Sequence, residues 1–432
     1  MKTKLTTLSV LTALLILGTT ASAQNEVKQP IDVKIYQVEK RLDNYTRPIT
    51  FTPTKATAVN GAISENIMTT TQNILNKEAY FLKKAMVKTV GEDAFSAWEL
   101  TSDEGGVHHH QTAPNPLTYY AVGASSSLLT QVERAIQVMG LEVEEVKVES
   151  KIFFRWSDAM TNKWAGFTDK VVSNILIKSN ESPEKIKALK EMALNAWAVG
   201  EGLANKSTID VGILVNSDEW AGVQARSGNV PSPISVDNGK TITNITPDLT
   251  LKTMEVEKDL AVEMGNFPNP MVFTEISIAE SAKDADRPYM HKIRAKSLTQ
   301  NYKTWELYAD DSRGYKGIDK APTSRAYFTV GTSFCLKSQL TAAKMAYKKQ
   351  GVNIEDFRVE HQFNYQQENF MTPSMKGHLD DVITRVIVKS DADKEVVNNY
   401  AKMALRMCFA GEGIQNETEM DTKVYLNGKV LK

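Results

Sequence analysis

The sequence contains one segment twice, and this repeat constrains the fold more than any other feature. Residues 113–128 align with residues 321–336 at a constant offset of 208 (321 minus 113). Further on, residues 192–202 align with residues 403–413 at an offset of 211 (403 minus 192). A chain that repeats a supersecondary pattern builds similar structural units from it. We therefore expect two related units.

The chain has two cysteines, Cys335 and Cys408, and both lie in the second copy. The aligned positions of the first copy hold Ser127 and Trp197. Only the second copy therefore offers a pair of thiols. We expect the first copy, which lacks them, to act as a structural partner.

Length and charge narrow the class of protein. A chain of 432 residues exceeds what one hydrophobic core usually supports and suits two domains. The formal net charge is -1, which gives no electrostatic reason to bind nucleic acid or an anionic membrane surface. We expect neither as a partner.

The first 23 residues have the layout of a cleavable export signal. Two lysines, an apolar run over residues 8–17 and the Ala-Ser-Ala of residues 21–23 follow one another. The apolar run is too short to span a bilayer. We predict cleavage after Ala23 and a mature protein that is periplasmic or secreted.

Export bears on the thiols, because secreted proteins meet oxidising conditions. An even pair of cysteines in that setting is interpreted first as a disulfide, and closing a long loop contributes a few kcal/mol. A domain of this size does not need such a crosslink. A structural disulfide and a reactive thiol pair both stay open at this point.

Both copies predict the same order of elements: a strand, a long helix with the first cysteine position, two strands, a helix with the second cysteine position, and a closing strand. In the first copy these are residues 80–87, 116–139, 146–152, 171–177, 182–200 and 209–215. In the second copy they are residues 289–296, 324–350, 357–363, 382–388, 393–411 and 422–426. Gly140 and Gly351 are expected to end the long helices. The change of offset predicts three extra residues inside the second long helix.

These patterns divide the chain into five segments. A stretch rich in Pro, Ser, Gly and Asn separates the two copies, as is typical of a linker. The predicted segments are the signal at 1–23, an N-terminal extension without assigned function at 24–54, the first unit at 55–218, the linker at 219–255 and the second unit at 256–432.

The repeated unit resembles the OsmC/Ohr family of thiol peroxidases. Members of that family carry an Asn-Pro motif at the start of a long helix, a reactive cysteine further along that helix, and a second cysteine in the following helix. Asn115-Pro116 matches the motif in the first copy, and the run from Gly331 to Cys335 matches in the second. Cys408 falls at the second cysteine position.

The resemblance implies an α+β fold in which each unit has an antiparallel sheet and two main helices. Family members form intertwined dimers, so two units in one chain imply an intramolecular pseudo-dimer. It also implies reduction of organic hydroperoxides, in which Cys335 becomes a sulfenic acid and Cys408 resolves it to a disulfide. The implied partners are a small-molecule hydroperoxide and a dithiol reductant. No cofactor and no metal is implied.

The chain departs from the family pattern at the charged positions. Arg325 stands where the family's peroxidases usually have a glutamate. A guanidinium near Cys335 would favour the thiolate, which makes Arg325 a third candidate catalytic residue. Arg325 as a helix-surface residue paired with a carboxylate is the alternative. For the family's separate catalytic arginine, Arg47 and Arg294 are candidates.

Other groups favour structural interpretations. His108-His109-His110 is expected to be an exposed turn, with Zn or Cu binding as the alternative. Glu201 and Glu412, in the paired Gly-Glu-Gly segments, are expected to be solvated helix-end residues, with a position facing the cysteines as the alternative. Four aromatic residues on the cysteine-bearing helices are expected in the core: Tyr119, Tyr120, Tyr327 and Phe328.

Three functions are compatible with these sequence features. The first is an exported, tandem OsmC-like thiol redox protein that reduces organic hydroperoxides. The second is a non-catalytic OsmC-like binding or structural protein with a plain disulfide or idle thiols. The third, a protein that handles disulfides of other proteins, is disfavoured because the chain has no Cys-x-x-Cys motif.

Overall fold

The computed structural model describes residues 39–42, 62–73, 81–90, 97–104, 113–159, 161, 163–216, 241–242, 262–264, 267–269, 271–283, 289–298, 304–312, 315–317 and 320–432. Several features expected from the sequence lie outside the described residues: the signal at 1–23, most of the extension at 24–54 including Arg47, the turn with His108 to His110, and most of the linker at 219–255.

The described elements occur in a similar order in the two halves of the chain. The first half contains β1 (Glu39–Leu42), β2 (Ile63–Asn73), β3 (Lys83–Val90), β4 (Ala97–Ser102), α2 (Pro116–Met139), β5 (Val143–Ser157), β6 (Ala165–Ser179), α3 (Pro183–Asn195), α4 (Ala198–Ala204) and β7 (Ile209–Val215). The second half contains β8 (Thr241–Ile242), β9 (Val262–Met264), β10 (Phe267–Asn269), β11 (Met271–Ser281), β12 (His291–Ser297), β13 (Thr304–Ala309), α6 (Ser324–Lys348), β14 (Ile354–Glu368), β15 (Lys376–Ser390), α7 (Lys394–Met407), α8 (Phe409–Gln415), β16 (Glu419–Leu426) and β17 (Lys429–Val430). This mixed content confirms the α+β class.

Each of the two large sheets contains strands from both halves of the chain. One sheet has the order β1-β4-β3-β2-β14-β15-β7, and the other has the order β17-β16-β6-β5-β11-β12-β13-β8. The halves meet where β2 pairs with β14 and where β5 pairs with β11, both antiparallel. Strands of the first half therefore complete sheets with strands of the second.

This arrangement differs from the expectation of one antiparallel sheet in each unit. Near one edge of each sheet, a strand pairs in parallel with a strand of the other half: β7 with β15, and β16 with β6. The outer edges of β15 and β6 carry backbone groups that need hydrogen-bond partners. The closing strand of the opposite half supplies these partners.

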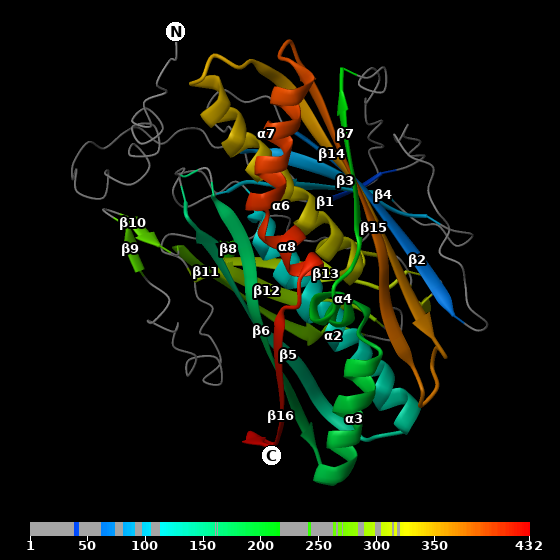
Figure 1. The fold of residues 1–432 in the computed structure, drawn as a ribbon. Helices are drawn as coiled ribbons and strands as arrows, with labels where there is room; N and C mark the ends of the chain where they lie inside the picture. Colours follow the sequence, from blue (N-terminus) through cyan, green and yellow to red (C-terminus); the bar gives the residue numbers. More distant parts are fainter. Residues whose placement is uncertain are drawn as a thin grey trace.

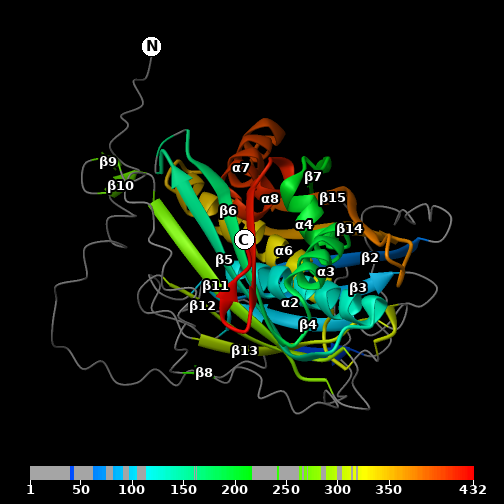
Figure 2. The same ribbon diagram turned by 90° about the horizontal axis from the view of Figure 1, so that it is seen from below.

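The two long helices, α2 and α6, lie between the sheets (Figures 1 and 2). α2 packs against the eight-stranded sheet, α6 packs against the seven-stranded sheet, and the two helices pack on each other. Asn115 begins α2 by accepting a 2.9 Å hydrogen bond from Thr118 N, with Pro116 at the first helical position. Thr323 caps α6 in the same way through Ala326 N.

Two glycines let α2 and α6 approach closely where they cross. A Cβ at Gly123 would lie 2.6 Å from Phe328 Cα, and a Cβ at Gly331 would lie 2.5 Å from Tyr120 N. No side chain fits at either point, because the obstructing atoms belong to backbone. The glycines of the repeated motif therefore set the distance between the two helices.

The ends of the long helices are close to the prediction. The expectation that the second long helix contains three extra residues is wrong. α2 has 24 residues and α6 has 25, so most of the extra residues of the second copy follow the helix and do not extend it. Gly140 ends α2 with φ 61°, and Gly351 has φ 80° beyond the end of α6. Glycine takes this left-handed conformation without steric cost.

The second helix of each half is broken, where the sequence predicts one helix. Trp197 separates α3 from α4, and Cys408 separates α7 from α8. Cys408 has φ -80° and ψ 107°, which is extended backbone. The second cysteine therefore lies at a junction between two helices and not within one.

Side chains from the opposite half accommodate these breaks. Trp156 Nε1 on β5 donates to the Met407 carbonyl at 3.2 Å. At the matching place, Gln367 Nε2 on β14 contacts the Ala196 carbonyl at 3.5 Å. The donors come from the other half of the chain. The local sequence pattern therefore does not predict the breaks.

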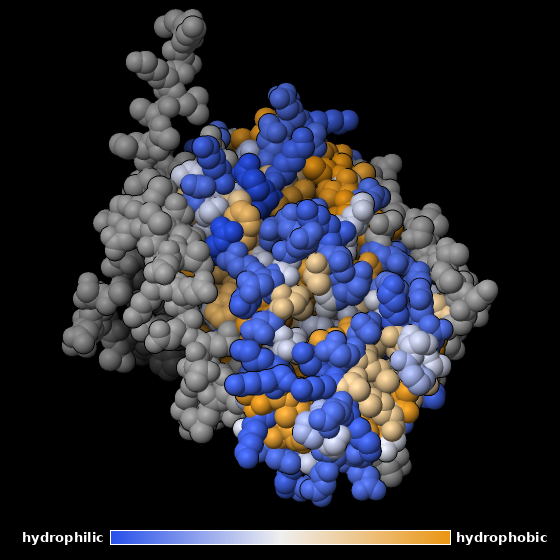
Figure 3. Space-filling model, turned by 60° about the horizontal axis from the view of Figure 1, so that its bottom comes forward, coloured by the Kyte–Doolittle hydropathy of each residue, from blue (hydrophilic) through white to orange (hydrophobic). Residues whose placement is uncertain are grey.

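The surface is mixed in polarity. Polar residues cover most of the face drawn in Figure 3, with smaller apolar patches among them. Among the described residues, the exposed large apolar side chains are Val211, Leu298 and Val430. No helix in this part of the chain is both long enough and apolar enough to cross a membrane.

Candidate dithiol site

The fold brings the two cysteines together. Cys335 lies one turn after Gly331 on α6, so it lies on the same helix face, close to the crossing with α2. Cys408 approaches from the break between α7 and α8. Both side chains are buried and both thiols are free. Cys408 lies close enough to Cys335 to raise the pKa of its thiol.

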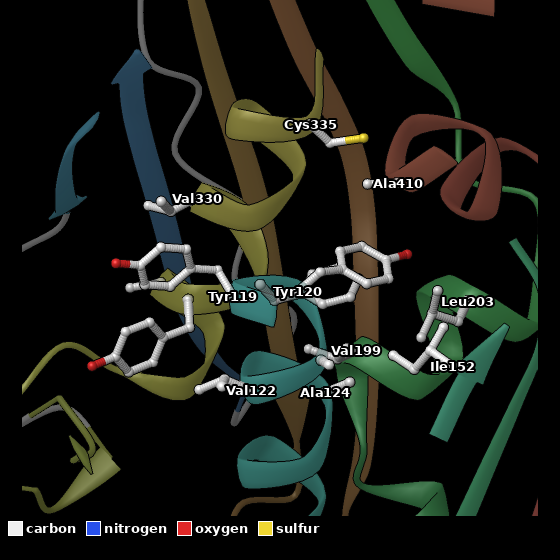
Figure 4. Packing of buried hydrophobic residues seen from close by; sticks show 14 of the residues in the cluster. Tyr119, Tyr120, Val122, Ala124, Ile152, Val199, Leu203, Val330, Cys335 and Ala410 are labelled. Atoms are coloured by element: carbon white, nitrogen blue, oxygen red, sulfur yellow. The ribbon is translucent and has the colours of Figure 1, made fainter. Parts of the chain in front are cut away.

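Backbone N–H groups at the start of α8 face the two sulfurs. The Gly411 N–H donates to the Cys408 sulfur at 3.4 Å, and the neighbouring Ala410 N–H lowers the pKa of the Cys335 thiol. Figure 4 shows the Cys335 side chain pointing toward Ala410. The break at Cys408 therefore places the start of α8, with its free N–H groups, beside the dithiol.

The pKa of the Cys335 thiol is raised well above its ordinary value. Burial is the main cause, and the Cys408 thiol and the Glu104 carboxylate act in the same direction. The backbone N–H of Ala410 acts in the opposite direction and lowers this pKa. Without another donor to its sulfur, Cys335 is a thiol and not a thiolate at neutral pH.

A charged cluster adjoins the cysteine-bearing helix. Lys83 Nζ on β3 lies 2.9 Å from Glu104 Oε1 and 5.9 Å from the centre of the Phe334 ring. Ser338 Oγ on α6 donates to the same carboxylate oxygen. Neither Lys83 nor Glu104 is a candidate from the sequence. Their link to Cys335 joins two halves of the chain, so only an alignment of relatives would have indicated it.

Arg325 has a carboxylate partner. Its guanidinium donates to Glu65 Oε2 at 2.7 Å and lies 4.3 Å from the centre of the Tyr315 ring. Burial alone would lower the pKa of Arg325, but Tyr315, Glu65 and Asp311 outweigh burial and raise it. Arg325 is buried, so the alternative of a paired residue agrees with the contacts, whereas its expected place on the helix surface does not.

The arginine candidates are separated from Cys335 along the fold. Cys335 follows Arg325 by ten residues on α6, which is about 15 Å along the helix axis. Arg294 lies on β12 in the eight-stranded sheet, whereas α6 packs on the seven-stranded sheet. A role for either arginine at the thiols stays a prediction.

In the first half, the counterpart of the dithiol is filled by an indole ring. Trp197 is buried, and its Nε1 donates to Ser127 Oγ at 2.8 Å. The Trp197 ring occupies the space beside Gly200, where a Cβ would overlap it. The two positions therefore meet in both halves, as thiol and thiol in one and as indole and hydroxyl in the other.

The paired glutamates join the two halves and are not solvated helix ends. Glu412 Oε2 on α8 accepts from Thr168 N of β6 at 2.7 Å. Glu201 Oε2 on α4 accepts from Leu379 N of β15 at 2.8 Å. Each carboxylate thus binds a strand of the opposite half, a contact that local sequence does not indicate.

Aromatic side chains surround the site. Phe409, directly after Cys408, stacks on Trp156 with ring centres 4.9 Å apart and meets Phe154 edge-on at 5.8 Å. Tyr120 stacks on Phe328 at 4.3 Å. The four aromatics expected in the core are fully buried, which confirms that prediction: Tyr119, Tyr120, Tyr327 and Phe328.

The chemistry available here is that of two neighbouring thiols. Two neighbouring thiols can form a disulfide, and a sulfenic acid on one can be attacked by the other. In the part of the chain that is described, no three His, Cys, Asp or Glu side chains converge as a metal site. The fold and site together define a mixed helix-and-strand protein with one buried dithiol.

Comparisons with known proteins add little to this description of the fold and the dithiol. No protein-family model matches the chain, and no curated protein matches it. The chain is similar to a solved OsmC-like hydroperoxide resistance protein from Jannaschia sp. CCS1, at 14% identity and a TM-score of 0.24. That match covers 37% of this chain and 95% of the other. Similarity at this level carries no argument about function, so the site rests on its own residues.

Proposed function

We propose that this protein is an exported, tandem OsmC-like thiol redox protein that reduces organic hydroperoxides. The observation that carries the proposal is a pair of free, buried thiols near each other, of which Cys408 accepts the Gly411 N–H. A buried pair of neighbouring thiols suits a reaction that alternates between dithiol and disulfide. Residues 1–23 would direct export, and the mass of the mature chain, beginning at Gln24, is the measurement that tests this.

The proposed reduction of a hydroperoxide proceeds in three steps. The Cys335 sulfur attacks the outer oxygen of the hydroperoxide, the O–O bond breaks, and the thiol proton ends on the departing alcohol. Cys408 then attacks the sulfenic sulfur, which forms a disulfide and releases water. An external dithiol reduces the disulfide by exchange and is itself oxidised.

The pseudo-dimer is also part of the proposal. The strand order of one large sheet repeats in the other: β1-β4-β3-β2-β14-β15-β7 corresponds to β8-β13-β12-β11-β5-β6-β16. α2 and α6 cross through equivalent glycines, Gly123 and Gly331. Two copies of one unit that exchange strands about a local two-fold axis would produce this pattern.

Peroxide consumption by single-cysteine variants tests the function. Reduced protein, Cys335→Ser and Cys408→Ser are each mixed with an organic hydroperoxide, and loss of peroxide and of free thiol is followed. Wild type should consume peroxide and lose both thiols. Cys408→Ser should accumulate a sulfenic acid on Cys335, detectable by mass spectrometry after trapping.

One result would reverse the conclusion. If wild type consumes peroxide no faster than Cys335→Ser, the protein is not a peroxidase. The alternative is then a non-catalytic OsmC-like binding or structural protein with idle thiols. The raised pKa of Cys335 favours this alternative, because a thiol reacts with peroxide far more slowly than a thiolate.

A further inference from the structure

Trp156 contacts the residues on both sides of Cys408. Trp156 lies on β5, in the half of the chain that has no cysteine. Its indole Nε1 donates to the Met407 carbonyl at 3.2 Å. Its ring stacks on Phe409, with the ring centres 4.9 Å apart and the ring planes 25° apart. One side chain of the other half therefore holds the chain directly before and directly after the second cysteine.

The hydrogen bond to Met407 replaces one that a continuous helix would make. In an α-helix, the Met407 carbonyl would accept from the backbone N–H of Gly411, four residues later. At the break, this carbonyl accepts from Trp156, and the Gly411 N–H donates to the Cys408 sulfur at 3.4 Å. A buried carbonyl without a donor is unfavourable. The Trp156 N–H therefore offsets the helical hydrogen bond that the break removes.

The half without thiols has a longer form of the same contact. Gln367 stands at the position equivalent to Trp156 (367 minus 156 is 211), and its Nε2 lies 3.5 Å from the Ala196 carbonyl. The same Nε2 donates to Gln131 Oε1 at 2.7 Å, so this amide has a closer acceptor elsewhere. The break that carries a thiol thus has the shorter bond from its donor. An amide at this position still reaches the carbonyl.

We propose that Trp156 is a positioning residue for Cys408, whose thiol it keeps beside Cys335 by holding the helix broken, so that the disulfide is favoured. Without the indole donor, the reduced protein can relax toward a continuous helix, whereas a disulfide enforces the break. Loss of the donor therefore weakens the disulfide. The proposal deepens the proposed function, and it rests on that function only where the disulfide follows a sulfenic acid.

The experiment compares three variants of the full chain. Trp156→Phe keeps a ring that can stack and removes the donor. Trp156→Gln removes the ring and keeps a donor, as Gln367 does at the other break. Trp164→Phe is the matched control, because the Trp164 ring lies 5.0 Å from the Trp156 ring and, among the described residues, its Nε1 has no hydrogen-bond partner.

The readout is the equilibrium between dithiol and disulfide. Each protein is equilibrated with a series of ratios of oxidised to reduced dithiothreitol. The two cysteines form one S–S bond, and the disulfide of dithiothreitol takes up their two electrons and two protons. Free thiols are then counted by mass spectrometry after alkylation in denaturant. Thermal unfolding of the same proteins separates an effect on the disulfide from a general loss of stability.

Trp156→Phe should weaken the disulfide by about fivefold to tenfold, because the broken helix loses a buried hydrogen bond. This change corresponds to a reduction potential about 20 to 30 mV less negative. Trp156→Gln should stay within about twofold of wild type, since it keeps a donor. Trp164→Phe should leave the equilibrium unchanged even where its thermal stability falls.

Two results would overturn the inference. If Trp156→Phe has the same dithiol equilibrium as Trp164→Phe, Trp156 contributes only to packing. If Trp156→Gln weakens the disulfide at least as much as Trp156→Phe does, a donor at this position does not hold Cys408.

Failure of the inference is distinguishable from failure of the proposed function, because no peroxide enters the equilibrium measurement. If Trp156→Phe weakens the disulfide as expected but wild type does not consume hydroperoxide, the proposed function falls and the positioning of Cys408 remains. If wild type consumes hydroperoxide but Trp156→Phe matches Trp164→Phe, only the inference falls.

Discussion

Two buried glutamates on the β-strands facing the long helices have different partners. Glu65 is paired with the guanidinium of Arg325. Glu275 accepts hydrogen bonds from Asn115 Nδ2 at 3.2 Å and Thr118 Oγ1 at 2.9 Å, both of them neutral groups. Burial raises the pKa of Glu275 to about 7, and these hydrogen bonds only partly offset it. Glu275 is therefore a titratable group whose charge costs stability.

The Glu275 carboxyl predicts a pH-dependent stability. Its folded-state pKa of about 7 exceeds the ordinary value of 4.5, so the folded state holds a proton that the unfolded state has released. Its contribution is complete below pH 4.5 and is lost as the pH rises to about 7, a change of about 3 kcal/mol. Glu275→Gln should lack this loss.

Urea unfolding of wild type and Glu275→Gln at a series of pH values measures the effect. The stability of wild type relative to the variant should fall between about pH 4.5 and about pH 7 and then stay constant. The control is Glu191→Gln, whose side chain is 69% exposed. A constant difference between wild type and Glu275→Gln across this range would contradict the prediction.

The crossing of α2 and α6 decides how close the two halves come. In a helix, alanine is ordinarily more stable than glycine by about 1 kcal/mol. At Gly331 that preference conflicts with the backbone of Tyr120. The close approach brings the residue after one more turn, Cys335, near the partner helix. The packing of α2 on α6 and the position of the Cys335 thiol thus depend on the absence of a side chain at Gly331.

Gly331→Ala should destabilise the protein by at least about 2 kcal/mol, because the two helices must separate to admit a methyl group. Helix propensity by itself predicts that Gly331→Ala stabilises the protein. The free energy of unfolding from denaturant titration measures the change, with Ser126→Ala on α2 as a comparison that removes atoms and adds none. A stabilised Gly331→Ala would show that the helices are not in close contact.

The whole molecule is held together by strands shared between the halves. β2 pairs with β14, β5 with β11, β7 with β15 and β16 with β6, so each large sheet has two boundaries between halves. One large cluster of buried apolar residues includes residues of both long helices. Separating the halves would expose this core and break four strand pairings, so neither half has a complete sheet by itself.

Cutting the chain between the halves tests this shared architecture. A specific protease site inserted between residues 221 and 240, in the predicted linker, should be cut without dissociating the halves. The two pieces should elute together in size-exclusion chromatography under native conditions and separate only in denaturant. Pieces that elute apart without denaturant would contradict the strand exchange.

Much of the local structure could be predicted from the sequence. The repeat located α2 from Pro116 to Met139 as observed, because its Asn-Pro start and glycine end are signals that act over a few residues. The repeat also identified Cys335 and Cys408 as equivalent to Ser127 and Trp197, and these positions do meet in both halves.

The tertiary structure alone decided the features that join distant segments. The break at Cys408 depends on a donor from β5, the charged cluster beside α6 depends on Lys83 of β3, and Arg325 is paired with Glu65 of β2. Short-range signals fix helices and turns, whereas these contacts arise only when strands of one half complete the sheets of the other. By itself, the sequence determined which half carries the thiols. The fold decided what surrounds them, because most of those neighbours belong to the opposite half.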